Sequence, residues 1–276
     1  KEPRNPEEEA DPLIVHPDVR RMLMRSKALI DSGRMLACWT ALSIDKYEKD
    51  SDEKVRKEAH DLVELMTPII KSLLTDYGVE ITSNMLQIYG GHGYIKEYGM
   101  EQFYRDVRIA PIWEGTNGIQ ALDLAGRKMP QGMGRLLRRF FHPALDFIER
   151  NKDDENFKEF IVPFSKALKG LQKTTMYMAQ KGLSNPYEIG AAATDYQRQF
   201  GLVAMAYMWL LMLKVAFTKS NEDNYYKNKI ILARFFYEKI LPETLSIAIT
   251  ISSGSKTMMS LPDEGFDSIH NFTGAA

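Results

Sequence analysis

The chain has 276 residues and a formal net charge of −1, and 44% of its residues are hydrophobic. This length predicts one large or two ordinary domains with enough apolar side chains for a sizeable core. The near-neutral charge argues against a dedicated nucleic-acid binder, which is usually basic. The single cysteine, Cys38, excludes a disulfide framework and fits a reducing compartment, and we expect it to be a small buried side chain.

Residues 1–12 are acidic and broken by prolines, which is not the composition of a signal or transit peptide. We expect a linker here, in a chain that is part of a longer protein of the bacterial cytoplasm. The C-terminal residues carry no retention or peroxisomal signal. Residues 200–218 approach the roughly 20 apolar residues that a membrane-spanning helix needs. Because Lys214 interrupts this stretch, we expect a buried core helix and no membrane span.

Helical periodicity dominates the chain. The first predicted helix begins at Pro17 and ends near Lys49, and the second opens at Asp52 and stops at a pair of glycines. Pro68 falls inside the second pattern and predicts either a kink or a position near a bend. The remaining predicted helices are 100–109, 117–126 with Thr116 as N-cap, 134–150, 157–181, 187–219 and 223–258. Pro242 and Gly254 interrupt the last of these tracts.

No stretch shows the alternation of a strand, so the fold class is all-α. Pro130 and the glycines that follow mark one internal seam. We therefore expect a linker over 1–12, a helical domain over 13–129 and a second helical domain over 130–276.

The glycines Gly90, Gly91 and Gly93 follow the second helix. A helix C-cap with a tight turn would explain them, and so would close approach of the backbone to a ligand, because glycine has no Cβ. The sequence alone leaves both interpretations open.

Glu114 stands between Trp113 and Gly115 in an otherwise apolar segment. Burial against the indole of Trp113 would disfavour the charged carboxylate and so raise the pKa of Glu114. A general base that works near neutrality requires such a raised pKa. A glutamate placed at a helix entrance for electrostatic reasons is the alternative.

Other chemistries find little support. The histidines lack metal-ligand spacing, so no metal site is predicted. Serine and histidine occur without a nucleophile elbow. Three arginines, Arg135, Arg138 and Arg139, form a basic patch that is a weak candidate for nucleic-acid binding.

Three motifs carry a family resemblance: Gln87-Ile-Tyr-Gly-Gly-His-Gly-Tyr94, Tyr104-Arg-Asp-Val-Arg108 and Ile112-Trp-Glu-Gly-Thr-Asn-Gly-Ile-Gln120. In this order and spacing they resemble the C-terminal four-helix bundle of flavin-dependent acyl-CoA dehydrogenases. The resemblance covers about residues 13–129. The remaining residues look like a second helical bundle, the extra C-terminal region of larger members such as 3-methylmercaptopropionyl-CoA dehydrogenase.

The resemblance implies α,β-dehydrogenation of an acyl-CoA thioester. Glu114 matches the family's base, which removes the α-proton while the β-hydrogen leaves as hydride to the flavin of FAD. The backbone N–H of Glu114, next to Gly115, would hold the thioester carbonyl as an oxyanion hole does.

The resemblance also implies FAD contacts. Gln87, Gly90 and Gly91 match the segment that touches the FAD of a neighbouring subunit, and Thr116 and Gly118 match the loop that touches FAD in the same subunit. Glutamate is common in the family where this chain has Gly118.

Arg105 and Asp106 match motif positions with a structural role. The implied partners are an acyl-CoA substrate, an electron-transfer flavoprotein or similar acceptor, and further copies of the chain in a homodimer or homotetramer. The N-terminal helical domain and the β-domain of the family have no counterpart in this sequence, so we expect this chain alone to be inactive and to lose FAD. A non-catalytic helical oligomerisation module and an acyl-CoA oxidase are the alternatives.

Overall fold

The structure is a computed structural model, and it describes residues 10–266. Within this range the chain is helical and contains no strand, which confirms the all-α prediction. The α-helices are α1 (Pro17–Lys49), α2 (Glu53–Ile88), α3 (Met100–Val107), α4 (Asn117–Leu122), α5 (Arg135–Asn151), α6 (Lys158–Ser184), α7 (Pro186–Lys219), α8 (Asn224–Lys239) and α9 (Glu243–Ser252). The 3-10 helices are η1 (Leu13–Val15), η2 (Gly90–Tyr94), η3 (Lys96–Tyr98) and η5 (Asp263–Phe266), and η4 (Asp123–Lys128) is π-helical.

Local sequence explains most helix ends. Pro17 begins α1, and the Asp52 carboxylate caps α2 by accepting a hydrogen bond from the backbone N–H of Lys54 at 2.8 Å. One predicted helix differs from the structure, because the helix predicted over 117–126 ends at Leu122 and continues as η4. The tract over 223–258 divides into α8 and α9 at the predicted interruption. Pro242, which has no N–H to donate, lies at this division and is the N-cap of α9.

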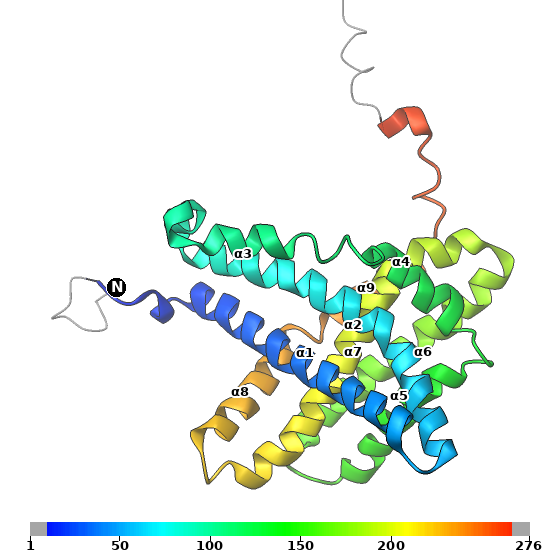
Figure 1. The fold of residues 1–276 in the computed structure, drawn as a ribbon, viewed down its shortest axis with the longest axis horizontal. Helices are drawn as coiled ribbons and strands as arrows, with labels where there is room; N and C mark the ends of the chain where they lie inside the picture. The colour runs from blue at the N-terminus through cyan, green and yellow to red at the C-terminus, as the bar shows by residue number, and fades with distance from the viewer. Residues whose placement is uncertain (1–9, 267–276) are drawn as a thin grey trace, which may run out of the picture.

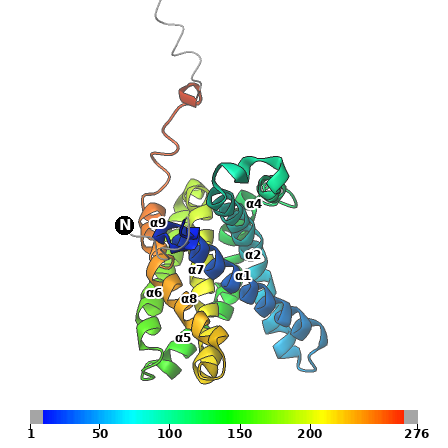
Figure 2. The same ribbon diagram turned by 90° about the vertical axis from the view of Figure 1, so that its left-hand side faces the viewer.

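Helix α7 is the central packing element. Figure 2 shows α2 and α4 on one side of it and α6 and α9 on the other, and α7 contacts all four helices. All residues from 199 to 210 are buried, so the middle of this helix is surrounded by other parts of the protein. By length and composition α7 could cross a membrane, but 72% of its apolar window is buried inside the protein. The predicted core helix is confirmed.

One hydrophobic core runs through the described residues. Leu36 and Leu65, which precede the predicted domain boundary at residue 130, belong to the same buried cluster as Trp209 and Phe236, which follow it. The division into two domains stays a prediction. Residues 1–9 of the expected linker lie outside the described residues. Cys38 is exposed, so the prediction that it is buried is wrong.

The chain reverses direction beyond the end of α2. Residues 84–113, which we call the arm, comprise the last turn of α2, η2, η3, α3 and the loop that follows. In Figure 1, α3 lies alongside α2 and leads the chain back towards α4. The arm therefore projects from the helical body and carries all but the last part of the sequence motifs.

Candidate active site

A tight turn between α3 and α4 presents Glu114. The backbone N–H of Trp113 donates to the carbonyl of Ile109 at 3.1 Å, and the N–H of Asn117 donates to the carbonyl of Pro111 at 3.0 Å. Between these bonds Glu114 has a φ of 51° and Gly115 a φ of 86°. The left-handed region costs a non-glycine residue on the order of 1 kcal/mol. The surrounding structure must therefore hold Glu114 in this conformation.

Helix α2 supplies that support. The Lys71 ammonium donates to the carbonyl oxygen of Gly115 at 2.7 Å and to the side-chain oxygen of Asn117 at 2.8 Å. The Gln120 amide donates to the carbonyl of Glu114 at 3.4 Å. An alanine at Gly115 would place its Cβ 2.8 Å from the Gln120 amide nitrogen. The Gln120 side chain could shift to relieve this contact, so it is the positive φ that favours glycine at this position.

Asn117 fixes the start of α4 against one turn of α2. Its amide nitrogen lies 3.2 Å from the carbonyl of Ser72, 3.0 Å from the hydroxyl of Thr75 and 2.7 Å from a carboxylate oxygen of Asp76. Burial raises the pKa of Asp76, and the hydrogen bond from Asn117 opposes that effect. Thr116 occupies the predicted N-cap position, but its side chain makes no capping hydrogen bond. Asn117 anchors this helix end instead.

Glu114 is exposed, and so is 57% of Trp113. The predicted burial of Glu114 against the indole is wrong for the described chain, because the left-handed turn directs this segment outward and no element in residues 10–266 covers it. The backbone N–H of Glu114 also donates to no acceptor within that range. An accessible carboxylate and an accessible N–H donor are therefore presented side by side.

The glycines at the end of α2 have different roles. Gly93 is buried, and a Cβ there would lie 2.4 Å from the carbonyl oxygen of Leu86, so packing within the chain requires glycine. Gly90 has a φ of 59°. A Cβ at Gly91 would meet nothing within 4 Å, and Gly91 has no positive φ. Gly91 therefore lies open to an approaching group, beside the exposed side chain of Gln87.

Thr116 and Gly118 lie with Glu114 rather than with the glycine corner. Both are exposed, and a Cβ at Gly118 would also meet nothing within 4 Å. Along α2, Lys71 and Gln87 are sixteen residues apart, which is about 24 Å at 1.5 Å per residue. The structure does not bring the two predicted groups of cofactor contacts together within one chain.

The arm exposes an unusual number of large apolar side chains. They are Tyr89, Tyr94, Ile95, Tyr98, Phe103, Tyr104, Ile109, Ile112 and Trp113. Exposed apolar side chains concentrated in one segment are typical of a site where protein or ligand binds. Arg105 pairs with Glu101 at 2.8 Å on the same helix, which fits its predicted structural role.

Two arginines of the predicted basic patch pair with acidic residues of α2, whereas Arg138 donates to the carbonyl of Met133 at 2.9 Å. Asp61, which is almost fully buried, pairs with Arg135 at 3.1 Å and with Arg139 at 3.4 Å. Glu58 pairs with Arg139 at 3.0 Å. These arginines join α5 to α2.

Comparison with known proteins accounts for both halves of the chain. The family model described as "Acyl-CoA dehydrogenase, C-terminal domain" matches residues 4–129, and the one described as "Acetyl-CoA dehydrogenase C-terminal like" matches residues 140–262. The chain belongs to the acyl-CoA dehydrogenase family. The resemblance noted in the sequence is confirmed.

Similar proteins include three bacterial dehydrogenases. The chain is 49% identical to 3-methylmercaptopropionyl-CoA dehydrogenase of Ruegeria pomeroyi over 133 residues, which are 48% of the chain and 22% of that protein. It is 28% identical to a butyryl-CoA dehydrogenase of Syntrophomonas wolfei over 92% of the chain and 43% of that protein. Broad-specificity linear acyl-CoA dehydrogenase FadE5 of Mycobacterium tuberculosis is 27% identical over 91% of the chain and 43% of that protein. The chain thus spans less than half the length of these relatives.

The fold is also found in solved structures. Caenorhabditis elegans ACDH-11, in complex with C11-CoA, matches 84% of the chain and 37% of its own length, with a TM-score of 0.70 and 20% identity. Acyl-coA oxidase3 from Yarrowia lipolytica matches 92% of the chain and 42% of its own length, with a TM-score of 0.58 and 14% identity. At these identities the likeness shows the fold, which confirms the predicted acyl-CoA dehydrogenase C-terminal architecture.

The sequence did not predict the polar residues of α2 that hold the turn. Lys71, Ser72, Thr75 and Asp76 lie more than forty residues before Asn117 and belong to no recognised motif. The one available signal was polar residues at a helical spacing on the otherwise apolar α2. The sequence does not show which part of the chain they meet.

Proposed function

We propose that the protein containing this chain catalyses α,β-dehydrogenation of an acyl-CoA thioester, with Glu114 as the base that removes the α-proton. The observation that supports this role is the turn itself. Glu114 is held in a left-handed conformation by bonds from Lys71 and Gln120 to the carbonyls of Gly115 and Glu114. Backbone strain that neighbouring groups maintain is typical of functional sites.

The carboxylate and the N–H of Glu114 have complementary tasks. The exposed carboxylate is free to accept the α-proton of a bound thioester. The N–H, which has no acceptor within the described residues, is free to donate to the thioester carbonyl and stabilise the negative charge that proton removal creates. Gly115 allows the thioester to come close to this backbone.

The predicted cofactor is FAD, and the residues around the turn and the glycine corner fit it. Gln87 and Thr116 offer exposed polar side chains, and Gly91 and Gly118 offer backbone that no part of the described chain covers. When bound, FAD supplies the hydride acceptor. Because the glycine corner lies about 24 Å along α2 from the anchor of Glu114, we assign Gln87, Gly90 and Gly91 to the FAD of a neighbouring subunit.

The exposed apolar arm supports an assembly of several parts. Tyr94 is 81% exposed and Phe103 66% exposed in the described chain. We propose that a second copy of the chain and the FAD-binding domain of the same protein cover this surface, in a homodimer or homotetramer. An electron-transfer flavoprotein or a similar acceptor would then reoxidise the enzyme in the bacterial cytoplasm.

The decisive experiment is Glu114→Gln in the flavin-loaded protein. Flavin reduction would be followed with butyryl-CoA, longer straight-chain thioesters and 3-methylmercaptopropionyl-CoA as probes. We expect the variant to retain flavin and to lose about 10²- to 10⁴-fold in rate. The control is Glu97→Gln, an exposed glutamate of η3 on the same arm, which should keep the wild-type rate.

Three results would redirect the assignment. A Glu114→Gln rate within tenfold of the wild type would exclude Glu114 as the base. A flavin-loaded wild type that none of the thioesters reduces would favour the non-catalytic oligomerisation module. Rapid reoxidation of the reduced protein by dioxygen would favour an acyl-CoA oxidase.

A further inference from the structure

Helix α2 lacks one backbone hydrogen bond just before the residues that hold the active-site turn. Pro68 is buried inside this helix and has no N–H to donate to the carbonyl of Glu64. Lys71 and Asp76, which anchor the turn, and Gln87, which begins the glycine corner, all follow Pro68. The angle of α2 at Pro68 therefore determines the position of both groups of candidate site residues.

Helix α7 contacts α2 at Pro68. Gln197 is 3% exposed, and its amide nitrogen donates to the carbonyl oxygen of Pro68 at 2.8 Å. A buried hydrogen bond of this kind resists displacement, because separating the groups leaves the buried amide nitrogen of Gln197 without its acceptor. The contact lies one helical turn before Lys71.

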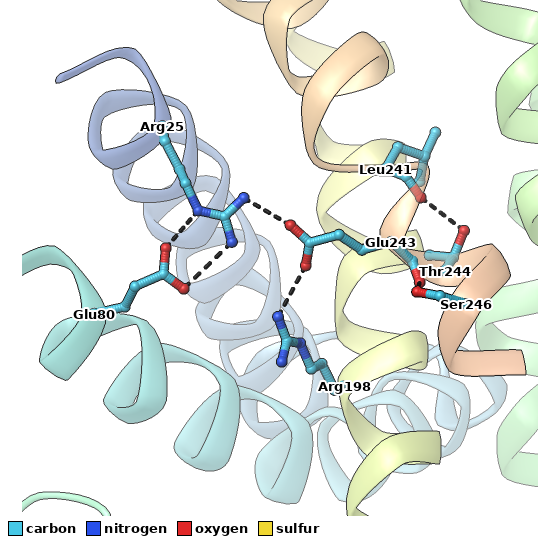
Figure 3. Close-up of polar contacts among 7 residues, drawn as sticks. All are labelled: Arg25, Glu80, Arg198, Leu241, Glu243, Thr244 and Ser246. Carbon is cyan, nitrogen blue, oxygen red and sulfur yellow. Dashed lines mark hydrogen bonds and ion pairs between the residues drawn. The ribbon is translucent and has the colours of Figure 1, made fainter. Parts of the chain in front are cut away.

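The next residue of α7 reaches α2 farther along through an ion-pair network. Figure 3 shows Arg198 bonded to Glu243 of α9, Glu243 bonded to Arg25 of α1, and Arg25 bonded to Glu80 of α2. The distances are 2.9 Å from Arg198 to Glu243 and 2.7 Å from Arg25 to Glu243. This network joins helices that belong to both matched family regions.

Between these two contacts the side chain of Leu73 packs against Gly201 of α7, and a cavity lies beside this contact. The cavity has a volume of about 270 Å³, and Asp76, Tyr77 and Asp195 are among its lining residues. Tyr77 is 5% exposed, and its hydroxyl has no hydrogen-bond partner of standard geometry within the described chain. Apolar packing at Leu73 therefore leaves the polar part of this α2 face unpacked, and the polar contacts on either side of the cavity add to the contacts that position α2.

We infer that Gln197 and the Arg198–Glu243 pair are positioning residues through which the C-terminal helical region fixes the active-site turn. They hold α2 on both sides of the cavity and so fix Lys71 and Asn117, which in turn hold Glu114. The inference rests on the proposed function of Glu114, but its structural half can be tested without activity. It also gives residues 130–276 a role in the reaction that the base alone does not suggest.

The test compares Gln197→Met with Gln199→Met. Gln199 is a matched control because it is also buried on α7, but it bonds Thr174 at 2.7 Å and the carbonyl of Thr244 at 3.2 Å, both within the C-terminal region. Methionine keeps the length of either side chain and removes the hydrogen bonds. Amide hydrogen exchange would be measured on the chain, and flavin reduction and KM on the flavin-loaded protein.

Gln197→Met should increase exchange over residues 69–88 by about tenfold, while Gln199→Met should leave that segment unchanged. In the flavin-loaded protein, Gln197→Met should lower the maximal rate of flavin reduction by about tenfold at nearly constant KM, because the base is displaced from the α-proton. Gln199→Met should keep the wild-type rate.

Equal effects of both variants on exchange or on rate would overturn the inference, as would no effect of Gln197→Met. If the wild type reduces no flavin with any thioester, the proposed function fails, and the exchange comparison alone decides whether α7 holds α2.

Discussion

Replacing Asn117 with alanine should destabilise the folded chain by about 2–3 kcal/mol. The two N–H groups of the Asn117 amide serve three acceptors, of which Asp76 at 2.7 Å is the nearest, and its oxygen accepts from Lys71 at 2.8 Å. The Asn117 side chain therefore makes two donated bonds and one accepted bond. Three bonds at about 1 kcal/mol each would contribute about 3 kcal/mol, and the partial exposure of the site lowers the expected destabilisation to about 2–3 kcal/mol.

Urea unfolding followed by far-UV circular dichroism would measure this loss. The matched control is Asn84→Ala, because Asn84 is also half-buried and its side chain makes no hydrogen bond within the described residues. The unfolding free energy of Asn84→Ala should stay within about 0.5 kcal/mol of the wild-type value. A loss below about 0.5 kcal/mol for Asn117→Ala would refute the conclusion that Asn117 fixes the turn to α2.

Two further predictions concern α2 and the glycine corner. Gly93→Ala should lower the melting temperature, because the added Cβ would lie 2.4 Å from the carbonyl oxygen of Leu86. Gly91→Ala should leave the melting temperature unchanged, because a Cβ there meets nothing within 4 Å. Equal melting temperatures of the two variants would contradict the different roles of these glycines. Burial raises the pKa of Asp76, so the folded chain binds this proton more tightly than the unfolded chain does, and stability falls as pH rises above about 4. Asp76→Asn keeps an acceptor for Asn117 and removes this titration. The unfolding free energy of the variant relative to the wild type should therefore increase as pH rises above about 4, and a pH-independent difference would argue against the assignment.

Much of the architecture could be predicted because local physical rules fix it. Helical periodicity located α1, α2, α5, α6 and α7 to within a few residues, and the caps at Pro17 and Asp52 placed two helix starts. The motif from Gln87 to Gln120 identified the family before any fold was known. The position of Glu114 within that motif made it the candidate base.

The burial of single side chains could not be predicted in this way. An apolar neighbourhood in sequence suggested that Glu114 and Cys38 are buried, and both are exposed. Burial depends on what packs over a residue, and sequence neighbours do not supply that information. The left-handed φ of Glu114 could not be predicted from the sequence either, since it depends on the hydrogen bonds that hold Gly115 and Asn117 against α2.

The sequence by itself determined which segments are helical, where most of them begin and end, and which motif carries the candidate chemistry, because these properties depend on residues close together in the chain. Tertiary structure alone decided that Lys71 meets Gly115 and that Gln197 meets Pro68. These partners are 44 and 129 residues apart, and the hydrophobic core that brings them together is formed by the whole chain. The base is thus specified locally, but its position is set by contacts that exist only in the folded protein.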